Sequence, residues 1–146
     1  MTAKKMFLNA LFTAIVLSLT SCGAFAYYAL PADDVRELND AVRTSLRECN
    51  YDFVLSAHVQ LAAGREPSKQ WFDANASRCI ERFERVIDLA EALEREAVHP
   101  RHRVSCQRTI KMAHREILKI EFLRACYEQT NDREANLDCF RAAHTL

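Results

Sequence analysis

The residues of this sequence best suited to chemistry are its six cysteines, because thiols can form disulfides, carry lipids or act as nucleophiles. They are Cys22, Cys49, Cys79, Cys106, Cys126 and Cys139. No two of them form a C-x-x-C motif, so the spacing indicates neither a thioredoxin-type redox pair nor a haem attachment site. Cysteines of exported chains usually pair, and five of the six follow residue 31. At least one of these five is therefore expected to be free or to bond a second chain.

Few other residues form a catalytic or metal-binding pattern. Glu96 and His99 have the Glu-x-x-His spacing that places two side chains on one metal, but di-iron bundles need this motif twice. Gly64 is the one glycine after residue 23, which excludes glycine-rich phosphate loops. Neither G-x-S-x-G nor H-E-x-x-H occurs. We therefore expect no enzyme activity, no cofactor and no metal site.

The elements that position the cysteines are predicted to be helices, because the chain has too few turn residues for a β-rich domain. Its breakers after residue 30 are Pro31, Gly64, Pro67 and Pro100. They predict a first helix that ends before Gly64 and a second that begins at the N-cap Ser68 and ends before Pro100. A third helix is expected over about residues 101–129 and a short fourth over about 133–144. Short connections favour an elongated antiparallel bundle.

The apolar side chains of these helices repeat at alternating spacings of four and three residues, as in helices that pack in bundles. The stripe of the second helix is Phe72, Ala76, Cys79, Phe83, Val86, Ala90, Leu93 and Ala97. The stripe of the third is Cys106, Ile110, Ala113, Ile117 and Ile120. The first helix is expected to face inward with Val35, Leu38, Val42, Leu46, Cys49, Phe53 and Leu61. Its Asn50-Tyr51-Asp52 stretch forms helix poorly and is expected to distort it.

The levels of the cysteines in such a bundle predict how they pair. Counting residues along antiparallel helices sets Cys49 level with Cys79 and Cys126 level with Cys139, because every helical residue rises by about 1.5 Å. We predict these two disulfides and leave Cys106 unpaired at a lower level. Some of the cysteines could instead be buried thiols, and Cys106 could join two copies of the chain.

Charge is balanced over the chain but uneven along the second and third helices. The formal net charge is zero, which argues against nucleic-acid binding. Residues 81–96 are mainly acidic and residues 101–124 mainly basic, and antiparallel packing would set them side by side. We favour ion pairing between the two helices at solvated edges. The alternative is a basic face for an acidic protein or anionic lipid, and its candidate residues are Arg108, Lys111, Arg115 and Lys119.

Trp71, with Phe72, opens the second helix beside a turn. We expect Trp71 to close the end of the core. The alternative is an exposed aromatic anchor for a protein partner.

Residues 1–22 have the pattern of a secretory signal, with Lys4 and Lys5 before an apolar stretch and a small-residue site. Leu19-Thr20-Ser21-Cys22 resembles the lipobox of bacterial lipoproteins. The resemblance implies cleavage before Cys22, a palmitate-type lipid anchor on this cysteine, and residues 23–31 as a tether to the bundle domain at 32–146.

Two other fates of the N-terminus are open. Cleavage after Ala26 would release a soluble chain, and without cleavage residues 6–30 are long enough to span a bilayer. All three place the domain outside the cytoplasm, either as an outer-membrane lipoprotein facing the periplasm or as a soluble periplasmic or secreted protein.

These observations predict a non-enzymatic envelope protein that binds another envelope or secreted protein, of the inhibitor, exclusion, immunity or secretion-accessory type. The alternative is a carrier that holds an apolar ligand or lipid within the bundle. A pocket lined by Phe53, Phe83 and Ile117 would favour the carrier. A filled core with a patch or groove outside it would favour the protein-binding module.

Overall fold

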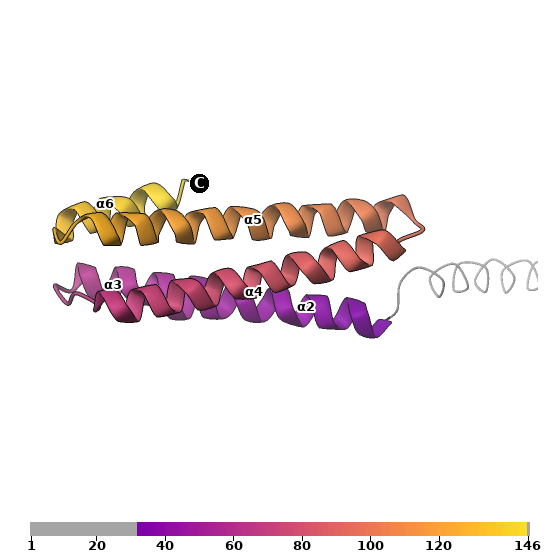
Figure 1. Cartoon of the computed structure of the whole chain (residues 1–146), viewed down its shortest axis with the longest axis horizontal. Coiled ribbons are helices and arrows are strands. Elements are labelled where there is room, and N and C mark those ends of the chain that lie inside the picture. The colour runs from indigo at the N-terminus through magenta and orange to yellow at the C-terminus, as the bar shows by residue number, and fades with distance from the viewer. Residues whose placement is uncertain (1–31, 146) are drawn as a thin grey trace, which may run out of the picture.

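The computed structural model describes residues 32–145, and all of its elements are helices (Figure 1). One long first helix is made of α2 (Ala32–Leu46), η1 (Arg47–Leu55) and α3 (Ser56–Ala62). It is followed by α4 (Lys69–Glu96), α5 (Pro100–Gln129) and the short α6 (Arg133–Ala143). The predicted all-α bundle of three long helices and a short fourth is therefore confirmed. No helix within residues 32–145 combines the length and the apolarity needed to cross a membrane.

The connections are set by the predicted breakers and caps. Gly64 has a φ of +75°, and the N–H groups of Gly64 and Arg65 bond the carbonyls of Leu61 and Gln60. This is the Schellman arrangement, which needs a left-handed residue after the helix. The Ser68 hydroxyl accepts a hydrogen bond from the Trp71 N–H at 3.2 Å, which confirms Ser68 as the N-cap of α4.

The distortion expected in the first helix is a change of helix type. η1 is π-helical over nine residues and includes Asn50, Tyr51 and Asp52. The flanking residues Leu46 and Ser56, and Leu55 at the end of η1, keep ordinary right-handed helical dihedrals, so the helix continues through η1 without a break. π-helical turns, which are wider than α-helical turns, are rare and are frequently found at functional sites.

The core lies where the four helices face one another, and α6 covers one end of it. α6 packs against α3 and α5 (Figure 1). The whole predicted stripe of α4 is buried. In the first helix Leu38, Cys49, Phe53 and Leu61 are buried as predicted, whereas Val35, Val42 and Leu46 are only partly buried. These three residues lie in α2, away from the end of the bundle that α6 covers.

The predicted stripe of α5 is partly wrong. Cys106, Ala113 and Ile120 are buried, but Ile110 and Ile117 remain partly exposed, and Glu116 is buried in their place. This difference arises from the neighbouring helices. α4 and α6 cover faces of α5 that differ from the face defined by a single heptad stripe.

Four aromatic rings join the four helices at the α6 end. Phe72 of α4 stacks on Tyr127 of α5 with ring centroids 4.3 Å apart. It also meets Phe53 of η1 edge-on at 4.9 Å and Phe140 of α6 at 6.3 Å. Offset and edge-on aromatic pairs stabilise beyond the area they bury, so this cluster fixes how the helices meet.

Substituting Tyr127 by phenylalanine tests a buried hydrogen bond in this cluster. The Tyr127 hydroxyl donates to the Pro67 carbonyl at 2.7 Å, and we expect Tyr127→Phe to lower the free energy of unfolding by about 1–2 kcal/mol at pH 7, because that carbonyl loses its partner. Denaturant unfolding at pH 7 measures this loss.

The pH dependence of the same variant gives a second readout. Burial, helped by the negative charge of Glu66, raises the pKa of Tyr127 to about 12 from its ordinary value of 10. The folded state therefore holds this proton more tightly than the unfolded state does. The resulting stability is present below pH 10 and is lost between pH 10 and about 12. The gap between wild type and Tyr127→Phe should narrow across that window, and a constant gap would contradict the assignment.

Candidate functional site

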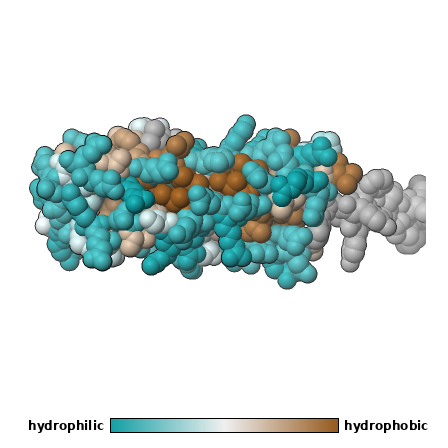
Figure 2. All heavy atoms as spheres, in the orientation of Figure 1, coloured by the Kyte–Doolittle hydropathy of each residue, from teal (hydrophilic) through white to brown (hydrophobic). Residues whose placement is uncertain are grey.

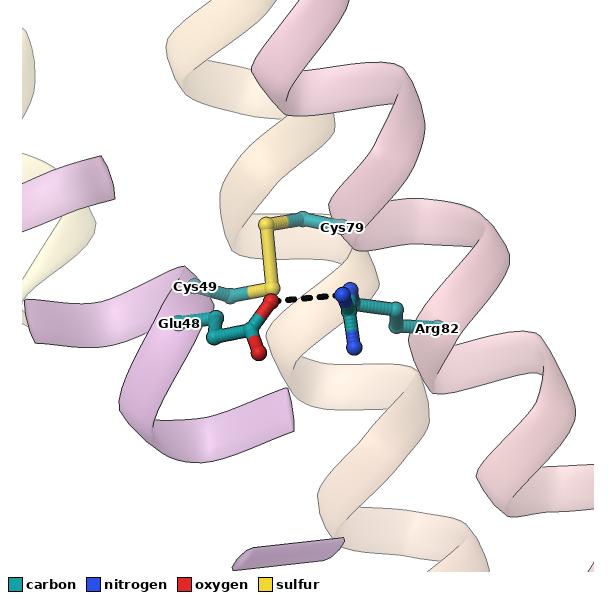
Figure 3. Close-up of a disulfide and its surroundings, with 4 residues drawn as sticks. All are labelled: Glu48, Cys49, Cys79 and Arg82. Atoms are coloured by element: carbon teal, nitrogen blue, oxygen red, sulfur yellow. Dashed lines mark ion pairs between the residues drawn. A yellow bond between two sulfur atoms is a disulfide. The ribbon is translucent and has the colours of Figure 1, made fainter. Parts of the chain in front are cut away.

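Two disulfides form a covalent framework, and both were predicted. Cys49 of η1 bonds Cys79 of α4 with Cα atoms 5.6 Å apart, and Cys126 of α5 bonds Cys139 of α6 with Cα atoms 6.3 Å apart. Figure 3 shows the first bridge beside an ion pair, in which Glu48 and Arg82 approach to 2.6 Å. The π-helical segment is thus tied to α4 by a covalent bond and a salt bridge. Disulfides of this kind indicate an oxidising, extracytoplasmic compartment.

Cys106 is free and buried, as predicted. Burial raises the pKa of its thiol, and the negative charge of Glu94 raises it further. Both effects disfavour the thiolate, which is the reactive form. Cys106 is therefore a small apolar residue of the core, and its burial argues against a disulfide to a second chain.

The favoured interpretation of the charged segments is wrong. No ion pair within the described chain joins residues 81–96 to residues 101–124. Instead Arg82 and Arg85 of α4 turn to the first helix, where they pair with Glu48 and Glu37. The salt bridge between α4 and α5 is Asp73–Arg124, at the other end of α4, at 2.6 Å. Apart from Arg124, the basic residues of α5 form no ion pair with α4.

The four predicted basic residues separate into two groups. Arg108, Lys111 and Arg115 are exposed and form no ion pair with any described residue. Lys119 differs, because its ammonium lies 2.7 Å from the carboxylate of the buried Glu116 and its side chain is 17% exposed. Lys119 therefore stabilises a buried carboxylate and is not part of a free basic face.

Exposed apolar side chains extend the row of the three free bases in both directions. Val104 lies on its N-terminal side, and Leu118 and Phe122 lie on its C-terminal side, with exposed fractions of 45%, 62% and 37%. We call the six residues the basic stripe: Val104, Arg108, Lys111, Arg115, Leu118 and Phe122. Their spacings alternate between four and three residues, so they share one face of α5.

Sequence reasoning missed the apolar half of the basic stripe, although a signal for it was present. The six residues form a second heptad pattern on α5, offset from the stripe that faces the core. A helix that carries two such patterns has two faces able to pack against other helices. This outer heptad pattern is recognised only if the charged residues Arg108, Lys111 and Arg115 are counted as members of it.

Three hollows at the described surface are open to solvent and lined mainly by charged side chains. Those between α2 and α4, near the α4–α5 turn and beside η1 have volumes of about 330, 430 and 250 Å³. Phe53 lines the third together with charged residues, while Phe83 and Ile117 line none of the three. Ligand sites for apolar molecules are mostly apolar, so the arrangement that would favour a carrier is not found in these hollows.

No protein-family model, no curated protein and no solved structure matches this chain. Its function therefore has to be argued from its own geometry.

The remaining predicted residues lie away from the basic stripe. Trp71 is partly buried and packs edge-on against Phe53 with centroids 5.7 Å apart, as expected of a residue that closes the core. His99 is not at the end of α4 but is the N-cap of α5, where its Nδ1 accepts from the Arg101 N–H. Within residues 32–145 no group of three potential ligands could hold a metal ion. Cys22, the signal and the tether lie outside the described residues.

Proposed function

We propose that this chain is a non-enzymatic protein-binding module of the cell envelope, and that the basic stripe of α5 is its binding surface. The observation that carries the proposal is the combination of three unpaired bases with exposed Val104, Leu118 and Phe122 on one helical face. A face with this pattern fits a protein surface that offers both carboxylates and apolar side chains.

The rest of the molecule supports a role as a rigid platform. The core is filled by aromatic and aliphatic side chains from all four helices. Two disulfides hold the first helix to α4 and α6 to α5. A preformed face loses little conformational entropy when a partner binds, which favours recognition by this surface.

Reversing the three charges of the basic stripe tests the proposal. In the stripe-reversed variant, Arg108→Glu, Lys111→Glu and Arg115→Glu place three acids where an acidic partner would bind. We expect this variant to lose the partner that the wild-type chain captures by cross-linking in its native envelope, because like charges at an interface cost several kcal/mol. Quantitative mass spectrometry of the cross-linked material would measure the loss.

The matched control changes the same number of charges elsewhere. Arg65, Lys69 and Arg78 are also exposed and form no ion pair with a described residue. Reversal of these three to glutamate should leave capture unchanged. Equal loss in both variants would point to net charge instead of a surface, and recovery of lipid without any protein would overturn the proposal.

We further propose that Cys22 carries a lipid anchor and that residues 23–31 tether the bundle to the outer membrane. The lipobox-like Leu19-Thr20-Ser21-Cys22 supports this assignment. Labelled palmitate should be incorporated into the wild-type chain and not into Cys22→Ala. Incorporation that persists in Cys22→Ala would refute the anchor, and release of an unlabelled chain that starts at Tyr27 would favour cleavage after Ala26.

A further inference from the structure

A strip of isoleucines runs along the edge where α4 and α5 meet. On each helix the residues that lie along this edge are spaced seven apart, which is two helical turns. They are Asp73, Ile80, Ile87 and Glu94 on α4, and Arg103, Ile110, Ile117 and Arg124 on α5. Polar contacts close both ends of the edge, since Asp73 pairs with Arg124 and the Glu94 carboxylate accepts from the Gln107 amide at 2.7 Å. We call the residues between them the isoleucine strip: Ile80, Ile87, Ile110 and Ile117.

The isoleucine strip is only partly covered by the chain itself. Ile80, Ile110 and Ile117 pack against the core yet remain partly exposed. Figure 2 shows a band of apolar atoms along the middle of one face, between α5 and α4, bordered by polar atoms. An apolar band of this kind on an otherwise charged surface is typical of a face that meets another protein.

Acidic side chains border the isoleucine strip on α4. Glu84 and Glu91 follow Ile80 and Ile87 by four residues each, so they lie one helical turn along from these isoleucines. Asp88 lies between the two glutamates. All three are exposed, and none forms an ion pair with a described residue. We call Glu84, Asp88 and Glu91 the acidic edge.

We propose that the isoleucine strip and acidic edge of one copy bind the basic stripe of a second copy. The inference rests on the proposed function, because it names the partner of the basic stripe as another molecule of this chain. The spacings match when the helices run antiparallel. Along α4 the acids are separated by four and then three residues, and so are Arg115, Lys111 and Arg108 when α5 is followed backwards.

This register pairs apolar surface as well as charge. The long stems of lysine and arginine can cover the isoleucines while their charged ends reach the carboxylates. With Arg115 of the second copy opposite Glu84, Leu118 of the second copy comes beside Ile80 and Glu81. Phe122 of the second copy then lies over Ser77 and Ala74, whose side chains are small enough to admit a ring.

The charges favour a second copy over a membrane surface. A bilayer rich in anionic lipid would attract the basic stripe but repel the exposed acidic edge on the adjacent helix. A second copy offers both signs at matched spacings. The two docking surfaces are different, so the contact is head to tail and can extend to further copies or close into a ring.

A charge-swap experiment tests the inference on the purified, oxidised, exported chain carrying Cys22→Ala, which prevents lipid-driven association. The edge-reversed variant carries Glu84→Arg, Asp88→Lys and Glu91→Arg, and the stripe-reversed variant is as defined above. We expect wild-type sedimentation to show assemblies that grow with concentration and dissociate in high salt. Each reversed variant alone should associate at least about 100-fold more weakly. An equimolar mixture of the two should again form assemblies that grow with concentration, because the native basic stripe meets the native acidic edge and the reversed edge meets the reversed stripe, so both contacts pair opposite charges.

The control variant carries Asp33→Arg and Asp34→Arg, which change exposed acids at the start of α2, away from both docking surfaces. It should associate as the wild type does. A wild-type chain that is still monomeric at about 1 mM, or a mixture that does not reassemble, would overturn self-association. Binding of that monomeric chain to vesicles of anionic lipid would assign the stripe to a membrane. Loss of a different captured protein by the stripe-reversed variant alone would leave the proposed function standing without this inference.

Discussion

Replacing Cys49 and Cys79 together by alanine is expected to lower the free energy of unfolding by about 3.6 kcal/mol. The two residues are 30 apart in the sequence, and the chain-entropy model assigns about this value to a cross-link that closes a loop of that length. Native domains are stable by roughly 5–15 kcal/mol, so the loss is a large fraction of the total. Denaturant unfolding under non-reducing conditions measures it.

Removal of this bridge is expected to destabilise the segment around Cys49 more than it destabilises the rest of the domain. Cys49 lies within π-helical η1, whose other tie to α4 in Figure 3 is the partly exposed Glu48–Arg82 ion pair. Partly exposed ion pairs contribute about 0–1 kcal/mol. Without the disulfide, hydrogen exchange should therefore accelerate first in η1 and α3, before it does in α5.

Two matched variants separate the covalent effect from side-chain effects. Removal of Cys126 and Cys139, which are 13 residues apart, should cost about 2.9 kcal/mol and should release α6. Substitution of Cys106 by alanine removes a buried thiol but no bridge, and should cost less than either pair. A loss below about 1 kcal/mol for the Cys49 and Cys79 pair would show that this disulfide does not constrain the unfolded chain as the model requires.

Much of this fold follows from local sequence patterns. Ser68 and Gly64 set the turn between the first two long helices, and the stripe of α4 is buried throughout because α4 has neighbours on two sides. The levels of the cysteines follow from helix length and direction alone, which is why both disulfides could be predicted. These features depend on one helix or on one antiparallel pair.

The features that sequence reasoning missed depend on three or four helices at once. Glu116 is buried because its face of α5 turns to the interior, whereas Ile110 and Ile117 border the outer edge. A heptad pattern alone does not show which of two adjacent faces of one helix is buried in the bundle. For the same reason Arg82 and Arg85 pair with the first helix and not with α5. The π-helical form of η1 likewise has no clear sequence signature beyond the weak helix formers at residues 50–52.

The same distinction applies to the proposed binding surfaces. Ile110 and Ile117, which a single pattern assigns to the core but the full bundle leaves partly exposed, belong to the isoleucine strip. Charges that were expected to pair within the chain, but remain unpaired, are those of the basic stripe and the acidic edge. Departures from local consistency tend to occur at functional sites, and in this chain they occur at the edges of α4 and α5 where we propose that partners bind.

Substituting Phe72 by alanine is expected to destabilise the domain by about 3–5 kcal/mol, because truncation of a fully buried ring leaves a cavity as well as lost apolar burial. Phe72 is 1% exposed and touches the rings of Phe53, Tyr127 and Phe140, so all four helices lose a contact at once. Denaturant unfolding gives the free energy, and near-ultraviolet circular dichroism reports the loss of packing around Tyr127.

Phe83→Ala is the control that isolates the aromatic contribution. Phe83 also lies on α4 and is 0% exposed, but its ring pairs with no other aromatic ring of the described residues. Aromatic pairs add about 0.5–1.5 kcal/mol each beyond burial, so Phe72→Ala should cost more than Phe83→Ala. Equal losses in the free energy of unfolding would mean that buried apolar area and cavity volume account for the whole effect, without a contribution from aromatic pairing. A larger cost at Phe72 would identify the four-ring cluster as the contact that keeps the short α6 docked, beside the Cys126–Cys139 bridge.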